Sequence, residues 1–442
     1  MGSKISKITA FAAPAIMALA VAAPSEAKVL LMGDGGWEVS FDGSVNGFYS
    51  FVTKDEPAET SANATHTSAD ADGEDTSRIT VGLLPAVWGM NIKAPTTNGL
   101  DMSSRIGLYP SIQNNRRKNT SQASSGGQNG GNLDLREIFF AVEGSSGKVL
   151  VGRTLGLYQG KNILTDMTLF GVGAGSASGG GTTLGRIGWG YVYPNFNAGI
   201  RYTTPDLGGG VKGEIGIFDP STIGGSVANV TETSMPRLEV ELSYAGNVSG
   251  VSVSAWANGM FQNAQRSTSD IRTACADISN GGTAVATAAT AGAVCGVSSS
   301  VNVGGGGYGL QLGIGGLTLT GSGYNGKGLG TTLMLDTDAL DASGSARTHS
   351  GFIGQGTYAF GQGTSVGASY GESRAKETGV DLRQRASVTV GIESQGLLDF
   401  MVWHDINKNW RFVAEYGLEE REWHDGANQE ASNISFGSFL FW

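Results

Sequence analysis

The sequence predicts an all-β fold, a transmembrane antiparallel β-barrel of sixteen strands. Apolar and polar residues alternate in segments of about ten residues with turn residues between them, as in strands that have lipid on one face and water on the other. The 442 residues include 71 Gly and only 10 Pro, a composition that suits long curved strands and would destabilise helices. After residue 30 no window approaches eighteen consecutive apolar residues, which argues against membrane-spanning helices.

The N-terminal residues have the pattern of an export signal. Lys4 and Lys7 precede an apolar run at 10–24 that is too short to span a bilayer as a helix. Ser25 and Ala27 place small residues at the two positions that signal peptidase reads. A buried helix is the alternative, but no helix start or stop signal frames the run. We therefore expect a cleaved signal peptide at 1–27 and a barrel domain at 28–442.

The charge of the chain is acidic. Removing residues 1–27 leaves 27 basic and 38 acidic residues, a formal charge of −11, which argues against nucleic acid as a partner. The four histidines are scattered, and no cofactor or metal site is expected. Cys275 and Cys295 are expected to form a disulfide that closes one exposed loop, because an exported chain passes through an oxidising compartment.

The alternation is clearest in three segments. In 37–51, Trp37, Val39 and Phe41 share one face, and Glu38, Ser40 and Asp42 share the other. The segments at 100–113 and 237–244 repeat this pattern. A soluble β-sandwich has the same period, but it does not need an even strand count or polar interiors throughout. The sixteen predicted strands are 37–51, 76–94, 100–113, 132–143, 148–155, 196–204, 210–219, 237–244, 251–263, 301–314, 317–326, 350–360, 364–376, 396–406, 410–423 and 432–442.

Short and long connections alternate, as expected if one barrel end faces the periplasm and the other faces the cell exterior. The acidic loop at 54–75 only partly matches a calcium-binding loop, so a solvated surface is the preferred interpretation. The basic cluster Arg116, Arg117 and Lys118 in the loop at 114–131 is interpreted as solvated, with lipopolysaccharide phosphates or a second subunit as possible contacts.

Residues 135–170 resemble the general diffusion porins of Gram-negative outer membranes. The stretch from Leu135 to Arg153 looks like the strand, glycine turn and strand of that family, and Thr165-Asp166-Met167 looks like the acidic tip of its third loop. Residues 407–416 and 434–442 resemble the last periplasmic turn and the terminal strand. The resemblance covers about a quarter of the chain in detail, and it lacks the glutamate that usually follows the acidic tip of the loop.

The resemblance implies a water-filled channel in the outer membrane, a third loop at 156–195 folded into the barrel, and a homotrimer. Its solutes would be small hydrophilic molecules and ions, and its surroundings would be the lipid bilayer and lipopolysaccharide. In the family the terminal strand is read by the barrel-insertion machinery, and here Phe436, Leu440 and Trp442 share one face of that strand.

Charged side chains define a candidate constriction. Alternation places Arg78, Arg105 and Arg201 on the polar faces of their strands, and the resemblance adds Arg136 and Arg153. An infolded loop carrying Asp166 is expected to face this arginine wall. The competing interpretation is that the arginines pair with Glu38, Asp42, Asp101 and Asp134 on neighbouring strands.

Three other functions would each need a feature of their own in the sequence. A substrate-specific channel would need an aromatic track, for which only Phe48, Tyr109 and Tyr324 lie on polar faces. A plugged barrel acting as an adhesin would conduct nothing. An outer-membrane hydrolase would need a nucleophile beside a histidine, but no Gly-x-Ser-x-Gly motif accompanies His404 or His424, so no enzymatic activity is expected.

Overall fold

The computed structural model describes residues 29–55, 75–112, 133–175, 178–179, 182–225, 230, 233–266, 271, 299–384 and 390–442. The predicted signal peptide, Cys275, Cys295, the basic cluster at 116–118 and most of the acidic loop lie outside these residues. None of the helices in the described part of the chain has the length and apolar composition that a membrane span requires.

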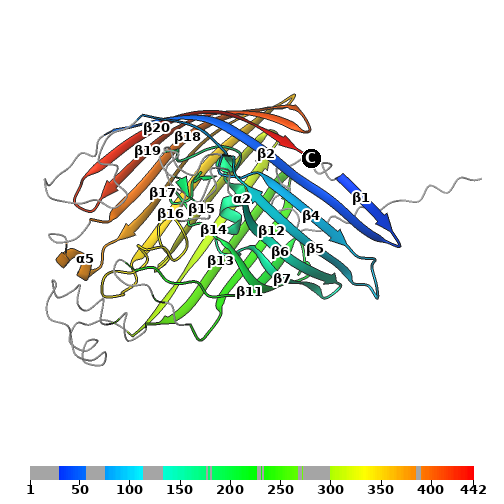
Figure 1. Cartoon of the computed structure of the whole chain (residues 1–442), viewed down its shortest axis with the longest axis horizontal. Helices are drawn as coiled ribbons and strands as arrows, with labels where there is room; N and C mark the ends of the chain where they lie inside the picture. The colour runs from blue at the N-terminus through cyan, green and yellow to red at the C-terminus, as the bar shows by residue number, and fades with distance from the viewer. Residues whose placement is uncertain are drawn as a thin grey trace, which may run out of the picture.

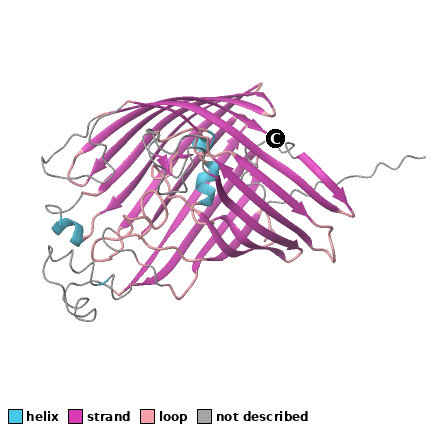
Figure 2. Cartoon of the chain, viewed as in Figure 1, coloured by secondary structure: helices cyan, strands magenta, loops and turns pink. Residues whose placement is uncertain are grey.

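Eighteen strands of the described part of the chain form one antiparallel sheet that closes into a barrel (Figures 1 and 2). Closure occurs where β2 pairs with β20, from Ser44 and Phe441 to Lys54 and Ala431. The short β1 (Val29–Asp34) pairs with the beginning of β2, and β3 and β4 together make one crossing, so the eighteen strands of the sheet give the sixteen predicted crossings. The crossings are β2 (Trp37–Lys54), β3 (Thr76–Thr80) with β4 (Val87–Lys93), β5 (Asp101–Pro110), β6 (Leu133–Gly144), β7 (Gly147–Leu155), β10 (Phe196–Thr203), β11 (Val211–Phe218), β12 (Arg237–Val248), β13 (Val251–Gln265), β14 (Ser300–Ile314), β15 (Leu317–Lys327), β16 (Thr348–Gly361), β17 (Thr364–Lys376), β18 (Ile392–Asn407), β19 (Trp410–Trp423) and β20 (Asn428–Phe441).

The period-two pattern places apolar side chains outside and polar side chains inside. In β2, Val45 and Tyr49 are 47% and 45% exposed, whereas Asn46 and Ser50 are buried. The same separation holds in β12, where Leu238 and Val240 point outward and Glu239 points inward. The bilayer selects this arrangement because it offers apolar side chains a favourable surface and polar ones none.

The prediction of one continuous strand at 76–94 is wrong at its centre. Residues 81–86 leave the sheet and turn into the lumen, where Pro85 has no N–H for the ladder. The side chain of Asn46 accepts a hydrogen bond from Gly82 N at 2.9 Å and donates to Leu84 O at 3.0 Å, which satisfies the displaced backbone. Gly82 lies against the infolded loop so closely that a Cβ would be 2.2 Å from Gly171 O.

The third loop, 156–195, folds inside the barrel, as predicted. It contains α2 (Gly160–Thr165) and the 3-10 helix η1 (Met167–Phe170). Two strands of two residues each, β8 (Ser178–Gly179) and β9 (Thr182–Thr183), pair with each other in the same loop. Figure 2 shows the helical part in the middle of the barrel, surrounded by strands. The helix α5 (Gly379–Gln384) belongs instead to a loop at the long-loop end.

Glycines on the inner face of β14 allow the loop to approach the wall. A Cβ on Gly305 would lie 2.9 Å from the hydroxyl of Tyr158, and one on Gly307 would lie 2.3 Å from Nε2 of Gln159. Any larger residue at these positions would push the start of the loop away from the sheet. Part of the high glycine content therefore makes room inside the barrel.

Candidate functional site: the constricted lumen

Two wall carboxylates bind the backbone of the infolded loop. Glu239 on β12 accepts hydrogen bonds from the N–H groups of Leu157 and Tyr158, at 2.7 and 3.0 Å. Glu415 on β19 accepts from Val172 and Gly173, both at 2.6 Å. Hydrogen bonds to an ionised acceptor are shorter and stronger than neutral ones, so these pairs fix the loop at its beginning and at its centre.

Neutral side chains of the wall continue this attachment. Gln355 on β16 binds both sides of the turn between the two helices of the loop, accepting from Met167 N at 3.0 Å and donating to Thr165 O at 2.6 Å. Trp256 on β13 donates its indole N–H to Oδ1 of Asn162 at 2.9 Å. These contacts satisfy polar groups that would otherwise be buried without a partner.

Arg186 attaches the returning half of the loop. It is fully buried, and it donates to the carbonyl oxygens of Ser369 and Leu397, on β17 and β18, both at 2.8 Å. Its Nε lies 3.9 Å from Oδ1 of Asp166. A charge so far from water is tolerated only with several hydrogen bonds and a counter-charge, and this site supplies both.

The expectation that Asp166 faces the lumen arginines is not met. Its side chain is fully buried, accepting from Thr168 N at 2.9 Å, from the Thr168 hydroxyl at 2.6 Å and from Tyr191 at 2.9 Å. Asp166 thereby caps η1. Burial raises the pKa of Asp166 above its usual range, although Arg186 and Thr168 act in the opposite direction. Its carboxylate interacts with Thr168, Tyr191 and Arg186 of the loop and does not contact the water of the pore.

Apolar packing fixes the centre of the loop to the sheet. The ring of Phe170 meets that of Phe439 on β20 edge to face, with centroids 5.5 Å apart, and Arg411 on β19 lies 5.1 Å above Phe170. A second cluster joins Leu169 and Trp189 of the loop to Ile353 on β16. The loop is therefore packed against the β12–β20 side of the barrel.

Arg105 on β5 lies on the inner face, as predicted, but it is not an unpaired charge. Its guanidinium contacts Asp42 on β2 at 2.8 Å and Glu137 on β6 at 2.7 Å, and it donates to Asn91 on β4 at 2.9 Å. The competing interpretation of cross-strand pairing holds for Arg105, with Glu137 as an additional partner.

The remaining inner arginines are also engaged. Arg136 on β6 pairs with Asp134 at 2.7 Å, and Arg201 on β10 lies 3.6 Å from Glu214 on β11. Arg78 on β3 is half-buried, between exposed neighbours on the outer face. The wall expected to be positive is a set of ion pairs in which the two signs alternate.

The structure places Arg153 on the opposite face from the one expected. In register it lies across from Ile138 on β6 and Ala198 on β10, and both are exposed on the outer surface. Side chains paired across an antiparallel ladder share a face, so Arg153 points away from the lumen. It therefore does not join Arg105, Arg136 and Arg201.

The aromatic side chains expected to face water are not a track for solutes. Phe48, Tyr109 and Tyr324 do point inward, but they are 1%, 2% and 3% exposed. Tyr109 donates to Glu137 at 2.8 Å, and Tyr324 packs in a cluster with Tyr158 of the loop. Because they are buried, these three side chains stabilise the interior and offer solutes no aromatic surface.

Comparison with known proteins agrees with this architecture. The family model described as Gram-negative porin matches residues 10–419. The chain belongs to the Gram-negative porins. No curated protein matches it in sequence.

Several solved porins and channels share the fold at low sequence identity. The outer-membrane channel DcaP of Acinetobacter baumannii is 14% identical, with 94% of this chain and 100% of that chain covered and a TM-score of 0.63. The anion-selective porin from Comamonas acidovorans is 16% identical, covering 92% of this chain and all of its own, with a TM-score of 0.55. OmpF of Salmonella typhi is 12% identical, with 92% and 100% covered and a TM-score of 0.52. The porin is thus an outer-membrane channel for passive diffusion.

The terminal strand of the porin is arranged as the sequence predicts. Phe436 and Leu440 are exposed on the outer face of β20. Trp442 follows on the same parity and exchanges two backbone hydrogen bonds with Gly43, at 2.9 and 3.1 Å. A Cβ on Gly43 would lie 2.8 Å from the indole, so the last residue also seals the closure of the barrel.

Sequence reasoning missed the residues that hold the loop in this porin. The alternation of Arg237, Glu239 and Glu241 placed all three inside, which is correct, but nothing local showed that Glu239 binds the loop. A charge on the inner face of a strand that faces an infolded loop is the signal to look for. Glu415 on β19 has the same inner-face position, but its partners lie more than 240 positions away in the chain. Arg186 belongs to the loop itself and carried no such signal.

Replacing Glu415 with glutamine tests the central attachment. The amide keeps one accepting oxygen and loses the charge, and hydrogen bonds to a charged group contribute roughly 1.5–3 kcal/mol each. The turn at 171–173 should then move away from the wall, and single-channel recordings should show more current noise and a changed mean conductance. Glu422→Gln, on the outer face of the same strand, is the matched control. Equal traces for both variants and the original protein would mean that Glu415 does not hold the loop.

Proposed function

We propose that small hydrophilic solutes and ions cross this porin between the infolded loop and the inner faces of β4–β7, β10 and β11. The supporting observation is that charged and polar side chains join the loop to β12, β13 and β16–β19: Glu239, Trp256, Gln355, Arg186 and Glu415. The opposite wall carries polar side chains, among them the Arg105 and Arg201 ion pairs. Apolar solutes would have to displace water ordered by these groups.

The proposed selectivity is weak. Positive and negative side chains alternate along this wall at ion-pair distance, so the field of one charge is largely cancelled by its neighbour. Asp166 adds no charge to the water because it is buried. Small neutral and zwitterionic solutes fit such a surface best, and the total charge of −11 for residues 28–442 adds a mild preference for cations.

We further propose that the porin is a channel without catalytic activity. Among the described residues, Thr364 and His404 form a contact that resembles a nucleophile and base, with 2.8 Å between their side-chain atoms. They are paired across β17 and β18 in the ladder. Over the described residues no acidic group contacts His404, so the third member of a catalytic triad is missing there.

We also propose a homotrimer in the outer membrane, with residues 1–27 removed on export. The support is the resemblance to trimeric general diffusion porins and the signal-like pattern at the N-terminus. An intact mass in mild detergent and the N-terminal sequence of the exported protein decide these two points.

Removing the charge of Arg105 tests the proposed path. Arg105→Ala would leave Asp42 and Glu137 uncompensated, so permeability should shift toward cations and the reversal potential in a salt gradient should move accordingly. Arg153→Ala, on the outer face, should leave the reversal potential unchanged. If Arg153→Ala shifted the reversal potential and Arg105→Ala did not, the proposed solute path would be contradicted. Absence of stepwise ohmic conductance in the original protein would contradict the channel itself.

Deleting Trp442 tests the proposed role of the terminal strand in insertion. The deletion removes an aromatic anchor at the membrane interface and the two hydrogen bonds to Gly43. The amount of heat-modifiable barrel in the membrane should fall, while the conductance of channels that do assemble should not change. Trp442→Phe keeps the backbone and an aromatic ring and should assemble normally. Normal assembly of the deletion variant would refute the role.

A further inference from the structure

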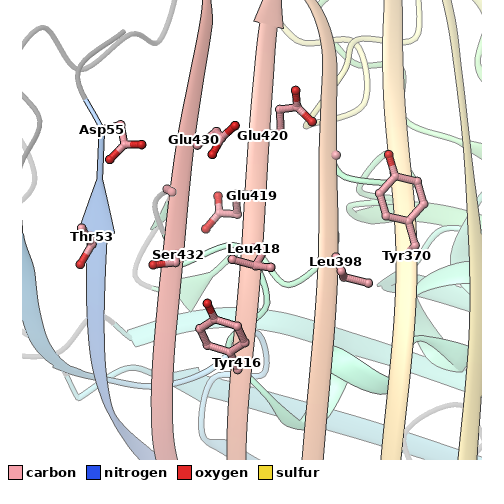
Figure 3. A pocket seen from close by; sticks show the side chains of 12 residues that line it. Thr53, Asp55, Tyr370, Leu398, Tyr416, Leu418, Glu419, Glu420, Glu430 and Ser432 are labelled. Atoms are coloured by element: carbon pink, nitrogen blue, oxygen red, sulfur yellow. The ribbon is translucent and has the colours of Figure 1, made fainter. Parts of the chain in front are cut away.

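The outer surface of the barrel has a depression at the long-loop end of β17–β20 and β2. It has a volume of about 380 Å³ and lies where Gly396 on β18 leaves a gap between larger neighbours. Figure 3 shows Leu398, Tyr416 and Leu418 along its lower part, Asp55, Glu420 and Glu430 along its upper part, and Tyr370 at one side. The depression thus has an apolar half toward the membrane and an acidic half toward the exterior.

The register shows that this depression faces outward. Tyr416 pairs with Ile434 on β20, which pairs in turn with Phe51 on β2, and all three are exposed. A Cβ at Gly396 would be 3.1 Å from the hydroxyl of Tyr370, so a larger side chain at this position would extend into the gap. Tyrosines with leucines beneath them are typical of the belt where a barrel meets the lipid headgroups.

The acidic half contains a like-charge pair. Glu420 on β19 and Glu430 on β20 lie directly opposite each other in the ladder. Asp55, which directly follows the third strand, β2, donates its backbone N–H to the backbone oxygen of Glu430. Like charges directly opposite on neighbouring strands are destabilising. Neither Glu420 nor Glu430 forms an ion pair with another of the described residues. Arg374, on the same face, is already paired with Glu372.

The geometry favours an organic cation as the missing counter-charge. Among the described residues no three Asp, Glu, His or Cys side chains are placed to hold one metal ion. The carboxylates instead offer separate acceptors in a row across three strands. An ammonium group has three donors on one nitrogen, which suits such a row. A bare phosphate would be repelled.

We propose that the depression docks an outer-leaflet lipid whose headgroup carries a primary ammonium group. The ammonium lies against Glu420 and Glu430 and relieves their repulsion. One acyl chain follows Leu398, Leu418 and Tyr416 and fills the gap at Gly396. This places a specific lipid on the closure side of the barrel, beside the strand pair β2–β20.

Native mass spectrometry of the detergent-solubilised porin tests this proposal. The probes are lysyl-phosphatidylglycerol and phosphatidylglycerol with identical acyl chains, which differ in their ammonium groups. The aminoacylated lipid should give one retained adduct per barrel, with an affinity about fivefold higher than that of phosphatidylglycerol, the effect expected when one of its two ammonium groups meets the carboxylates. The preference should weaken as salt is raised.

Three variants separate the parts of the site. Glu420→Gln with Glu430→Gln should abolish the preference, and Gly396→Leu should weaken binding of both lipids by filling the gap. Glu422→Gln removes a carboxylate from the same face of β19 outside the depression and should change nothing. Equal adducts for the two lipids, a preference that survives the double substitution, a phosphatidylglycerol adduct that needs calcium, or a site covered by a second copy of the chain would each overturn the proposal.

Discussion

The hydrogen bonds between wall carboxylates and the backbone of the infolded loop are the interaction on which the interior depends. A loop inside a barrel brings unpaired N–H groups into a confined space, where an unsatisfied donor costs about 1–3 kcal/mol. Glu239 and Glu415 each satisfy two of them. Because these glutamates lie on β12 and β19, they determine which side of the barrel the loop covers.

The same need for hydrogen-bond and charge partners explains why the charges of the lumen are paired. The loop uses its own acid, Asp166, to cap η1 and to balance Arg186, so no acidic tip projects into the water. The arginines of the open wall find partners on adjacent strands. A channel built in this way separates solutes by size and polarity more than by sign of charge.

Much of the fold could be predicted because its cause is local. The side-chain period of a strand is two, so the sequence of each strand shows which side chains share a face, and sixteen crossings follow from counting such segments. The infolded third loop was predicted from the family resemblance. For Arg153 the prediction came from the family resemblance and not from the alternation of its strand. Its parity with Val149 and Val151 places it outside, as observed, whereas the resemblance placed it inside. The break at 81–86 and the burial of Asp166 depend on contacts with Asn46, Arg186 and Tyr191, which no local pattern contains.

Accessibility of single cysteines to a charged thiol reagent tests the path of water most directly. Ser103, exposed on the inner face of β5, and Ser322, buried on β15 opposite Ile353, are the two positions to change, in a background with Cys275 and Cys295 replaced by serine. Because Ile353 packs against the infolded loop, Ser322 lies on the covered wall. The account predicts that the reagent lowers the conductance of Ser103→Cys channels and leaves Ser322→Cys channels unchanged. A fast reaction at Ser322→Cys with none at Ser103→Cys would contradict it.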